Sequence, residues 1–332
     1  MLGVGRREFI TLLGGAAAAW PLAARAQQPE RMRRIGVLMP LAADDPQSLR
    51  RLTAFVQGLQ QLGWTDGRNV RIDVRWAAGD PDRFRRYAAE LVGLAPDVIL
   101  AAAVSSMMPL QQATRSVPLV FVQVTDPVGA GFVASLARPG GNATGFTLFE
   151  FGVSAKWLEL LKEVAPRLTR VAVLRDPSSS TGIGQFAAMQ GVAPALGVEL
   201  SPIGVSDPGE IERTMAEFAR GSNGGLILVP TAQTLIHREL IITLAARHQL
   251  PTIYPYRYFV TAGGLMCYGP DEIEQYRHAA GYIDRILKGE KPADLPVMQP
   301  TKFELAVNVK TAKALGLTIP ESFLLRADAV VE

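Results

Sequence analysis

Hydroxyl and carboxylate side chains recur where predicted strands end, and these groups could build a binding site. The apolar run at residues 117–124 is typical of a strand that is buried on both faces of a parallel sheet. Thr125 and Asp126 follow this run directly. Because open α/β sheets bind ligands at the carboxyl ends of their strands, we expect Thr125 to offer a hydroxyl and Asp126 a carboxylate to a ligand.

Two more hydroxyls, those of Ser105 and Ser106, stand between a predicted buried strand at 96–102 and a predicted helix at 107–114. The free N–H groups and the dipole at a helix amino terminus favour an anion, so these serines would suit a carboxylate. In the alternative interpretation, either serine is simply the N-cap of the helix.

Other predicted strands also end in loops with candidate ligand contacts. Leu41 opens the loop after the first predicted strand, and Asp176 and Thr231 follow two strands in the second half of the chain. Asp176 precedes Pro177, so its alternative role is to form a turn. The run at 250–258 adds Tyr254 and Tyr256, whose rings could stack on a ligand or pack against the protein.

An alternation of strands and helices must position these residues, and it restarts after residue 146. Strands are predicted at 34–39, 70–76, 96–102, 117–124, 170–174, 198–203, 224–229, 250–258, 265–268 and 303–309. Helices are predicted at 48–62, 81–94, 107–114, 128–136, 154–164, 184–196, 208–220, 272–288 and 311–317, and one more ends at 248. This rhythm predicts an α/β fold with parallel sheets in two similar lobes.

The amino terminus has the features of an export signal. Arg6 and Arg7 precede an apolar run at 9–24, and Ala26 closes a small-x-small cleavage pattern. These features resemble a twin-arginine secretory signal, which predicts cleavage near Ala26 and a periplasmic protein. The alternative is an uncleaved anchor helix, although the run is shorter than the roughly 20 residues that a membrane span needs.

Composition argues against several classes of function. The chain has 332 residues and a formal charge of +3, and the segment 1–26 contributes three arginines and one glutamate to it. The remainder is therefore almost neutral and has no basic stripe, so we expect no nucleic acid partner. The single cysteine, Cys267, excludes an intrachain disulfide and a cysteine metal cluster. With no catalytic triad order and no histidine metal pattern, we expect no metal, no cofactor and no enzymatic activity.

Three stretches make the chain recognisable, and they extend over nearly all of the expected mature protein. The stretches are 126–128 with 135–142 (SLARPGGN), 251–269, and 299–305 (QPTKFEL) with 310–317 (KTAKALGL). The chain resembles the ABC transporter substrate-binding family that includes tryptophan- and tyrosine-type binding proteins. The resemblance implies a type I periplasmic binding protein: two doubly wound parallel-sheet lobes joined by three hinge crossings.

The same resemblance implies domain boundaries. The crossings are expected near residues 146, 251 and 292. The first lobe would then comprise 31–146 plus 251–291, and the second lobe 147–250 plus 292–332.

The resemblance also implies a function, which is capture of a small amino-acid-like solute, aromatic in the tryptophan- and tyrosine-type members. Asp126 or Asp176 would pair with an ammonium group of the solute. The hydroxyls of Ser105, Ser106 and Thr125 would bind its carboxylate. A monomer would close on the solute by hinge motion and deliver it to an ABC permease in the cytoplasmic membrane. The alternative is a periplasmic sensor that passes the bound state to a membrane receptor.

Overall fold

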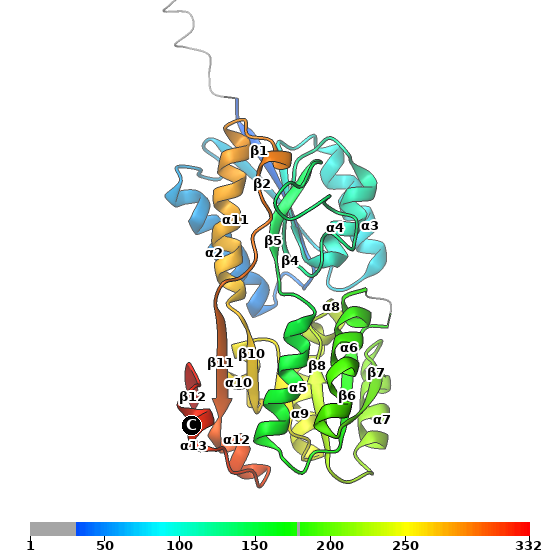
Figure 1. Cartoon of the computed structure of the whole chain (residues 1–332). Helices are drawn as coiled ribbons and strands as arrows, with labels where there is room; N and C mark the ends of the chain where they lie inside the picture. Colours follow the sequence, from blue (N-terminus) through cyan, green and yellow to red (C-terminus); the bar gives the residue numbers. More distant parts are fainter. Residues whose placement is uncertain (1–30, 178–179) are drawn as a thin grey trace, which may run out of the picture.

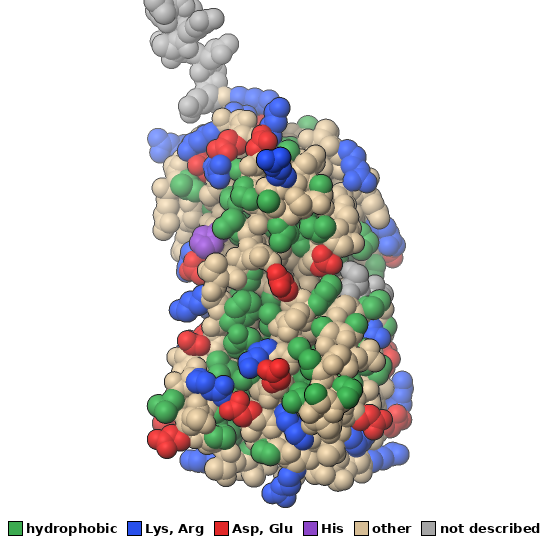
Figure 2. Space-filling view, in the orientation of Figure 1, with side chains coloured by type: hydrophobic (Ala, Val, Ile, Leu, Met, Phe, Trp, Pro, Cys, Tyr) green, Lys and Arg blue, Asp and Glu red, His purple; other side chains and the backbone are tan. Residues whose placement is uncertain are grey.

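The computed structural model describes residues 31–177 and 180–332, which form two α/β lobes stacked end to end (Figure 1). The expected export signal at 1–26 lies outside the described residues. No helix within the described ranges is long and apolar enough to cross a membrane. Basic and acidic side chains are interspersed over both lobes on the face shown in Figure 2.

The first lobe is built on a five-stranded sheet in the order β2-β1-β3-β4-β5, with every neighbouring pair parallel. Its strands are β1 (Arg33–Met39), β2 (Val70–Trp76), β3 (Val98–Ala102), β4 (Leu119–Val124) and β5 (Ala143–Thr147). Its helices are α2 (Pro46–Gln61), α3 (Pro81–Gly93), α4 (Ala103–Ala113) and α11 (Glu272–Leu287). In β1, Val37 belongs to the core under α2 and α11, and Leu38 to the core under α3 and α4. This period-two alternation buries both faces of the sheet.

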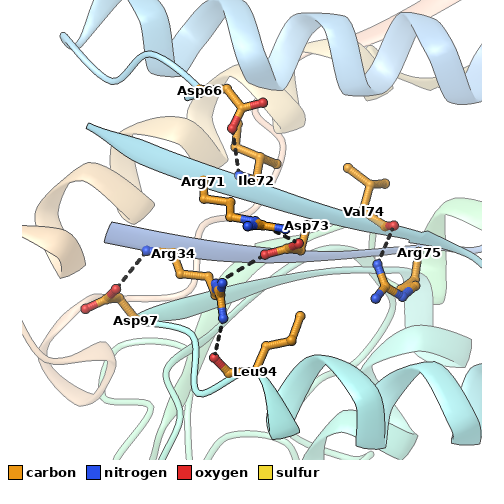
Figure 3. Close-up of polar contacts among 9 residues, drawn as sticks. All are labelled: Arg34, Asp66, Arg71, Ile72, Asp73, Val74, Arg75, Leu94 and Asp97. Atoms are coloured by element: carbon orange, nitrogen blue, oxygen red, sulfur yellow. Dashed lines mark hydrogen bonds and ion pairs between the residues drawn. The ribbon is translucent and has the colours of Figure 1, made fainter. Parts of the chain in front are cut away.

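The edge strand β2 is held by charge pairs along its polar face (Figure 3). Asp73 lies 3.3 Å from the Arg34 guanidinium on β1 and 3.4 Å from that of Arg71 on its own strand. Asp97 accepts a hydrogen bond of 2.8 Å from the backbone N–H of Arg34. Strand β2 is at the edge of the sheet, and its alternation of apolar and charged residues is typical of that position.

The second lobe is built on a seven-stranded sheet in the order β12-β11-β10-β9-β8-β6-β7. Its strands are β6 (Arg170–Arg175), β7 (Glu199–Gly204), β8 (Gly224–Leu228), β9 (Thr252–Tyr254), β10 (Met266–Pro270), β11 (Phe303–Asn308) and β12 (Ala329–Val331). Its helices are α5 (Gly152–Val164), α6 (Ser180–Val192), α7 (Pro208–Phe218), α8 (Ala232–Ile236), α9 (Arg238–Arg247), α10 (Arg257–Thr261), α12 (Val309–Ala314) and α13 (Glu321–Leu324). All pairs are parallel except β10 and β11, because β11 enters the sheet from the opposite end.

Two of the three crossings between the lobes lie at positions other than those expected. Strand β9 pairs with β8 and strand β10 pairs with β9, so the expected placement of 251–270 in the first lobe is wrong. The chain returns to the first lobe only at α11, near residue 271. It leaves again after Met298, later than the expected residue 292, because the N–H of Met298 still donates to the carbonyl of Gly145 at 2.9 Å. The first crossing follows β5, as expected near residue 146.

Local structure departs from the sequence pattern in several other places. The predicted strand at 250–258 is a strand only in β9, because helix α10 begins at Arg257. The expected helix at 128–136 is instead a series of turns, since Gly131 has a φ of 72° and Asp126 a φ of 47°. Strand β5 was not predicted. Gly145 allows it to pair closely with β4, where a Cβ atom would lie 2.0 Å from the carbonyl oxygen of Phe121.

Candidate functional site between the lobes

The two lobes contact each other directly where their strands end. The Arg238 guanidinium at the start of α9 lies 2.6 Å from the Asp45 carboxylate, just before α2. The Gln233 side chain on α8 donates to the carbonyl of Gly79 in the first lobe at 3.2 Å. Leu41, a predicted contact residue after β1, is 1% exposed and packs in the hydrophobic core of the second lobe. The lobes are therefore closed on one another.

Buried polar atoms without hydrogen-bond partners among the described residues gather at this boundary. Buried polar groups are normally paired, so such a cluster indicates groups directed at a ligand or water. Apart from Asp73, which is ion-paired, each lies near the carboxyl end of a strand or in the helix that follows. The residues are Ser48, Arg51, Ser105, Ser106, Gln123 and Thr125 from the first lobe, and Arg175, Gln185 and Tyr258 from the second.

Three predicted hydroxyl residues belong to this cluster. Helix α4 begins earlier than expected, so Ser105 and Ser106 lie in its first turn. Neither is the N-cap, because that position is Ala102, which makes no side-chain capping bond. Thr125 follows the neighbouring strand β4, and its hydroxyl is buried as well. The structure thus brings these three hydroxyls to adjacent strand ends, β3 and β4.

Asp126 is next to this group but is partly engaged in its own turn. Its Oδ1 accepts a hydrogen bond of 2.8 Å from the N–H of Gly129. A side chain at position 129 would meet this carboxylate, with a Cβ atom only 2.0 Å from Oδ2, which explains the glycine. Oδ2 makes no hydrogen bond within the described part of the chain. It is therefore available to a cation.

Asp176 and Thr231 occupy strand ends of the second lobe. Asp176 is half-buried immediately after β6. Thr231 is the N-cap of α8, where its hydroxyl accepts a bond of 3.3 Å from the N–H of Thr234. The Thr231 hydroxyl, the group predicted to contact a ligand, is therefore already used to cap α8.

The structure separates the two predicted tyrosines. Tyr254 is stacked on Phe259 inside the second lobe, with ring centroids 4.9 Å apart. It lines a cavity of about 510 Å³ that is formed by second-lobe residues alone. Tyr256 points the other way: its ring centroid lies 5.9 Å from the guanidinium carbon of Arg51 in the first lobe. Of the two tyrosines, only Tyr256 thus faces the boundary. Tyr254 packs against the protein, which is the alternative interpretation given for it above.

Arg51 is a buried charged residue at the boundary that was not among the predicted site residues. It is fully buried on α2 beside Tyr256 and Tyr258 of the second lobe and Tyr276 and Glu272 of α11. Burial raises the pKa of the Glu272 carboxyl, although the Arg51 guanidinium opposes part of that rise. A spacing signal was available, because Ser48, Arg51, Phe55 and Leu59 form one helical stripe and all are buried.

A cavity of about 290 Å³ opens where α2, α10, β10 and the start of α11 meet, and Tyr258 and Glu272 line it together with Cys267. Burial raises the pKa of the Cys267 thiol to about 12, so the thiol stays protonated and unreactive at neutral pH. Within 31–177 and 180–332, no group of three potential metal ligands comes together.

Comparison with known proteins gives consistent matches. The family model described as ABC transporter substrate binding protein matches residues 34–331. A tyrosine-binding protein of Clostridioides difficile (strain R20291) is 28% identical over 265 residues, which is 79% of this chain and 75% of the relative.

Two solved structures with 26% sequence identity show how the lobes compare. One is an ABC domain from Streptococcus pneumonia in complex with L-Trp, with a TM-score of 0.83 and coverage of 90% of this chain and 99% of the other. The other is the ligand-free, open structure of a substrate-binding protein with adhesive properties from Clostridium difficile. Its TM-score is 0.65, and the match again covers 90% of this chain and 99% of the other. The lobes of this chain are thus arranged more like those of the L-Trp complex.

Proposed function

Because this chain belongs to the family of ABC transporter substrate-binding proteins, we propose that its solute is an amino acid enclosed between the two lobes. The observation that carries the proposal is the cluster of unpaired buried polar atoms, which both lobes contribute at their strand ends. A solute held there would satisfy these atoms, and would favour the closed arrangement because it contacts both lobes.

The relatives support the amino acid class. One is named a tyrosine-binding protein, and the better-superposing structure contains L-Trp. An aromatic amino acid also fits the chemistry of the boundary, where Tyr256 and Tyr258 present stacked rings with centroids 5.5 Å apart.

Several residues have proposed roles toward this solute. Asp126 would pair with its ammonium group through the free carboxylate oxygen. Ser105, Ser106 and Thr125 would hydrogen-bond its polar atoms at the start of α4. Tyr256 would cover its apolar part, and Leu41 would close the boundary behind it. Asp176 remains a candidate on the second-lobe side.

Delivery to a permease requires export. We propose that residues 1–26 act as a twin-arginine signal and that the mature protein, a monomer, works in the periplasm. Replacing Arg6 and Arg7 with lysines should leave the full-length protein in the cytoplasm, as cell fractionation would reveal. Unchanged export would exclude the twin-arginine route without affecting the binding function.

Mass spectrometry of small molecules released from the purified protein tests the solute class. We expect an amino acid, and we expect isothermal titration to show that the same compound binds the emptied protein in a one-to-one ratio. A polyol or an inorganic ion as the only specifically bound species would contradict the proposal.

A further inference from the structure

We propose that Arg51 binds a carboxylate of the solute and is the principal charge-recognition residue of the site between the lobes. This inference rests on the proposed function and specifies the chemistry of that site. It restricts the solute to compounds with a carboxylate group.

The first observation is the isolation of a buried charge. Arg51 is 0% exposed, and none of its three guanidinium nitrogens has a hydrogen-bond partner among the described residues. A guanidinium remains protonated in proteins, and a buried charge is costly unless it is paired. Glu272 is an electrostatic neighbour of Arg51. Among the described residues, however, no carboxylate oxygen lies within 4.0 Å of the Arg51 guanidinium nitrogens, the distance of an ion pair. The guanidinium therefore has no direct anionic partner within the described residues, and an anionic ligand would supply one.

The second observation is its position. Helix α2 follows β1, so its first turns point toward the boundary, and helical side chains lean back toward the amino terminus. Tyr256, whose ring centroid is 5.9 Å from the guanidinium carbon, and Tyr258, which stacks on Tyr256, come from the second lobe. Arg51 is therefore enclosed by both lobes, and an anion bound to it would be shielded from water once they close.

The third observation is the set of donors around it. Gln123 is fixed by Tyr276, whose hydroxyl donates to its amide oxygen at 3.1 Å, and its amide nitrogen has no acceptor in the part of the chain that the structure describes. The hydroxyls of Tyr258 and Ser48 are also buried and have no hydrogen-bond partner within 31–177 and 180–332. Neutral donors in the same buried region as a planar guanidinium fork suit the two oxygens of a carboxylate. The hydroxyls at the start of α4 are then left for the other polar groups of the solute.

The competing explanation is structural. Arg51 could serve only to hold Tyr256 through the cation–π contact and so stabilise the closed lobes. The two explanations differ in one measurable respect, since only carboxylate recognition depends on a carboxylate in the ligand.

The experiment pairs variants with ligands that differ only in the carboxylate. Isothermal titration compares L-tyrosine with tyramine and L-tryptophan with tryptamine on the wild type, Arg51→Gln, Arg51→Lys and the control Arg115→Gln. Arg115 is an exposed arginine of the same lobe, before β4, at the opposite end of the sheet. Thermal melting of every variant separates lost folding from lost binding.

We expect the wild type to bind an amino acid at least about 100-fold more tightly than its amine, because the amine leaves the buried guanidinium unpaired. Arg51→Gln should weaken amino acid binding by a similar factor without weakening amine binding, because the variant has no buried charge for the amine to leave unpaired. Arg51→Lys should lie between, since lysine lacks the planar fork. Arg115→Gln should match the wild type.

Three outcomes would overturn the inference while leaving solute binding intact. These are an unchanged amino acid affinity in Arg51→Gln, an equal loss for amino acid and amine, and a wild type that does not discriminate between the paired ligands. If the wild type binds none of the four probes and releases no carboxylate compound, the proposed amino acid solute fails as well. Should Arg51→Gln not fold, Arg51→Lys and the wild-type ligand pairs still decide the question.

Discussion

Nη1 of Arg238 lies 2.6 Å from Oδ2 of Asp45, and this ion pair joins the two lobes. Both side chains are mostly buried, at 13% and 12% exposure. Asp45 is also the N-cap of α2, since its Oδ1 accepts from the N–H groups of Gln47 and Ser48 at 2.8 and 3.2 Å. One carboxylate thus orders the helix that carries Arg51 and also ties that helix to the second lobe.

Breaking this ion pair should weaken solute binding. Arg238→Gln and Asp45→Asn remove the charges, and asparagine preserves the cap. Because the closed arrangement loses a largely buried contact, we expect affinity for the solute to fall by about tenfold. Isothermal titration checks this. The matched control is Arg285→Gln, which breaks a pair of the same 2.6 Å length, Arg285–Glu290, within the first lobe. Equal effects from both ion pairs would argue against a role in closure.

Asp126→Asn should weaken binding of an amino acid by about 10- to 100-fold, because the ammonium group loses its anionic partner. The asparagine oxygen can still accept from Gly129, so the turn is preserved. Asp207→Asn is the control, since Asp207 likewise accepts a backbone N–H three residues on, at 3.0 Å, in the second lobe. Wild-type affinity in Asp126→Asn would remove Asp126 from the site.

The two tyrosines should respond differently to the same substitution. Tyr256→Leu should weaken binding of an aromatic amino acid by about tenfold, the worth of one aromatic contact. Tyr254→Leu removes the ring stacked on Phe259 in the core and should lower the free energy of unfolding by about 1–3 kcal/mol with affinity unchanged. Titration and urea denaturation together separate these effects. Loss of affinity in Tyr254→Leu at intact stability would restore Tyr254 as a ligand contact.

Glu272 should make stability depend on pH in a predictable direction. Burial raises the pKa of its carboxyl, so the folded protein binds a proton in a range where the unfolded chain has lost it. The free energy of unfolding therefore carries a contribution that is fully present below the ordinary pKa of 4.5 and is lost as pH rises through the higher folded pKa. Glu272→Gln removes this dependence.

Urea denaturation from about pH 4 to about pH 8 checks the pH effect. The stability of Glu272→Gln relative to the wild type should increase with pH over that range. A difference that stays constant across the range would show that the pKa of Glu272 is the same in the folded and unfolded states.

Much of the fold could be predicted because single elements carry strong local patterns. The capped helix after Asp80 and the alternating strand β2 both lie where the sequence indicates. The sequence could not show which lobe contains residues 251–270. That assignment depends on the pairing of β9 with β8, a long-range contact that leaves no local pattern. Strand β5, with Gly145 inside it, has no apolar run to reveal it.

The candidate site was only partly predictable for a related reason. Ser105, Ser106 and Thr125 could be found because strand ends are general ligand positions. Arg51 stands in the middle of an amphipathic helix, where an arginine normally indicates the solvent face. Its spacing from Phe55 and Leu59 is the one local sign of its burial, and its neighbours Tyr256 and Glu272 are distant in sequence.

A crystal structure of the protein with its solute bound tests the central claim most directly. We predict a solute enclosed between the lobes, within hydrogen-bond distance of first-lobe groups such as Thr125 and in contact with Tyr256 of the second lobe. A solute in the second-lobe cavity beside Ile242 and Lys310, or one that touches a single lobe only, would contradict it.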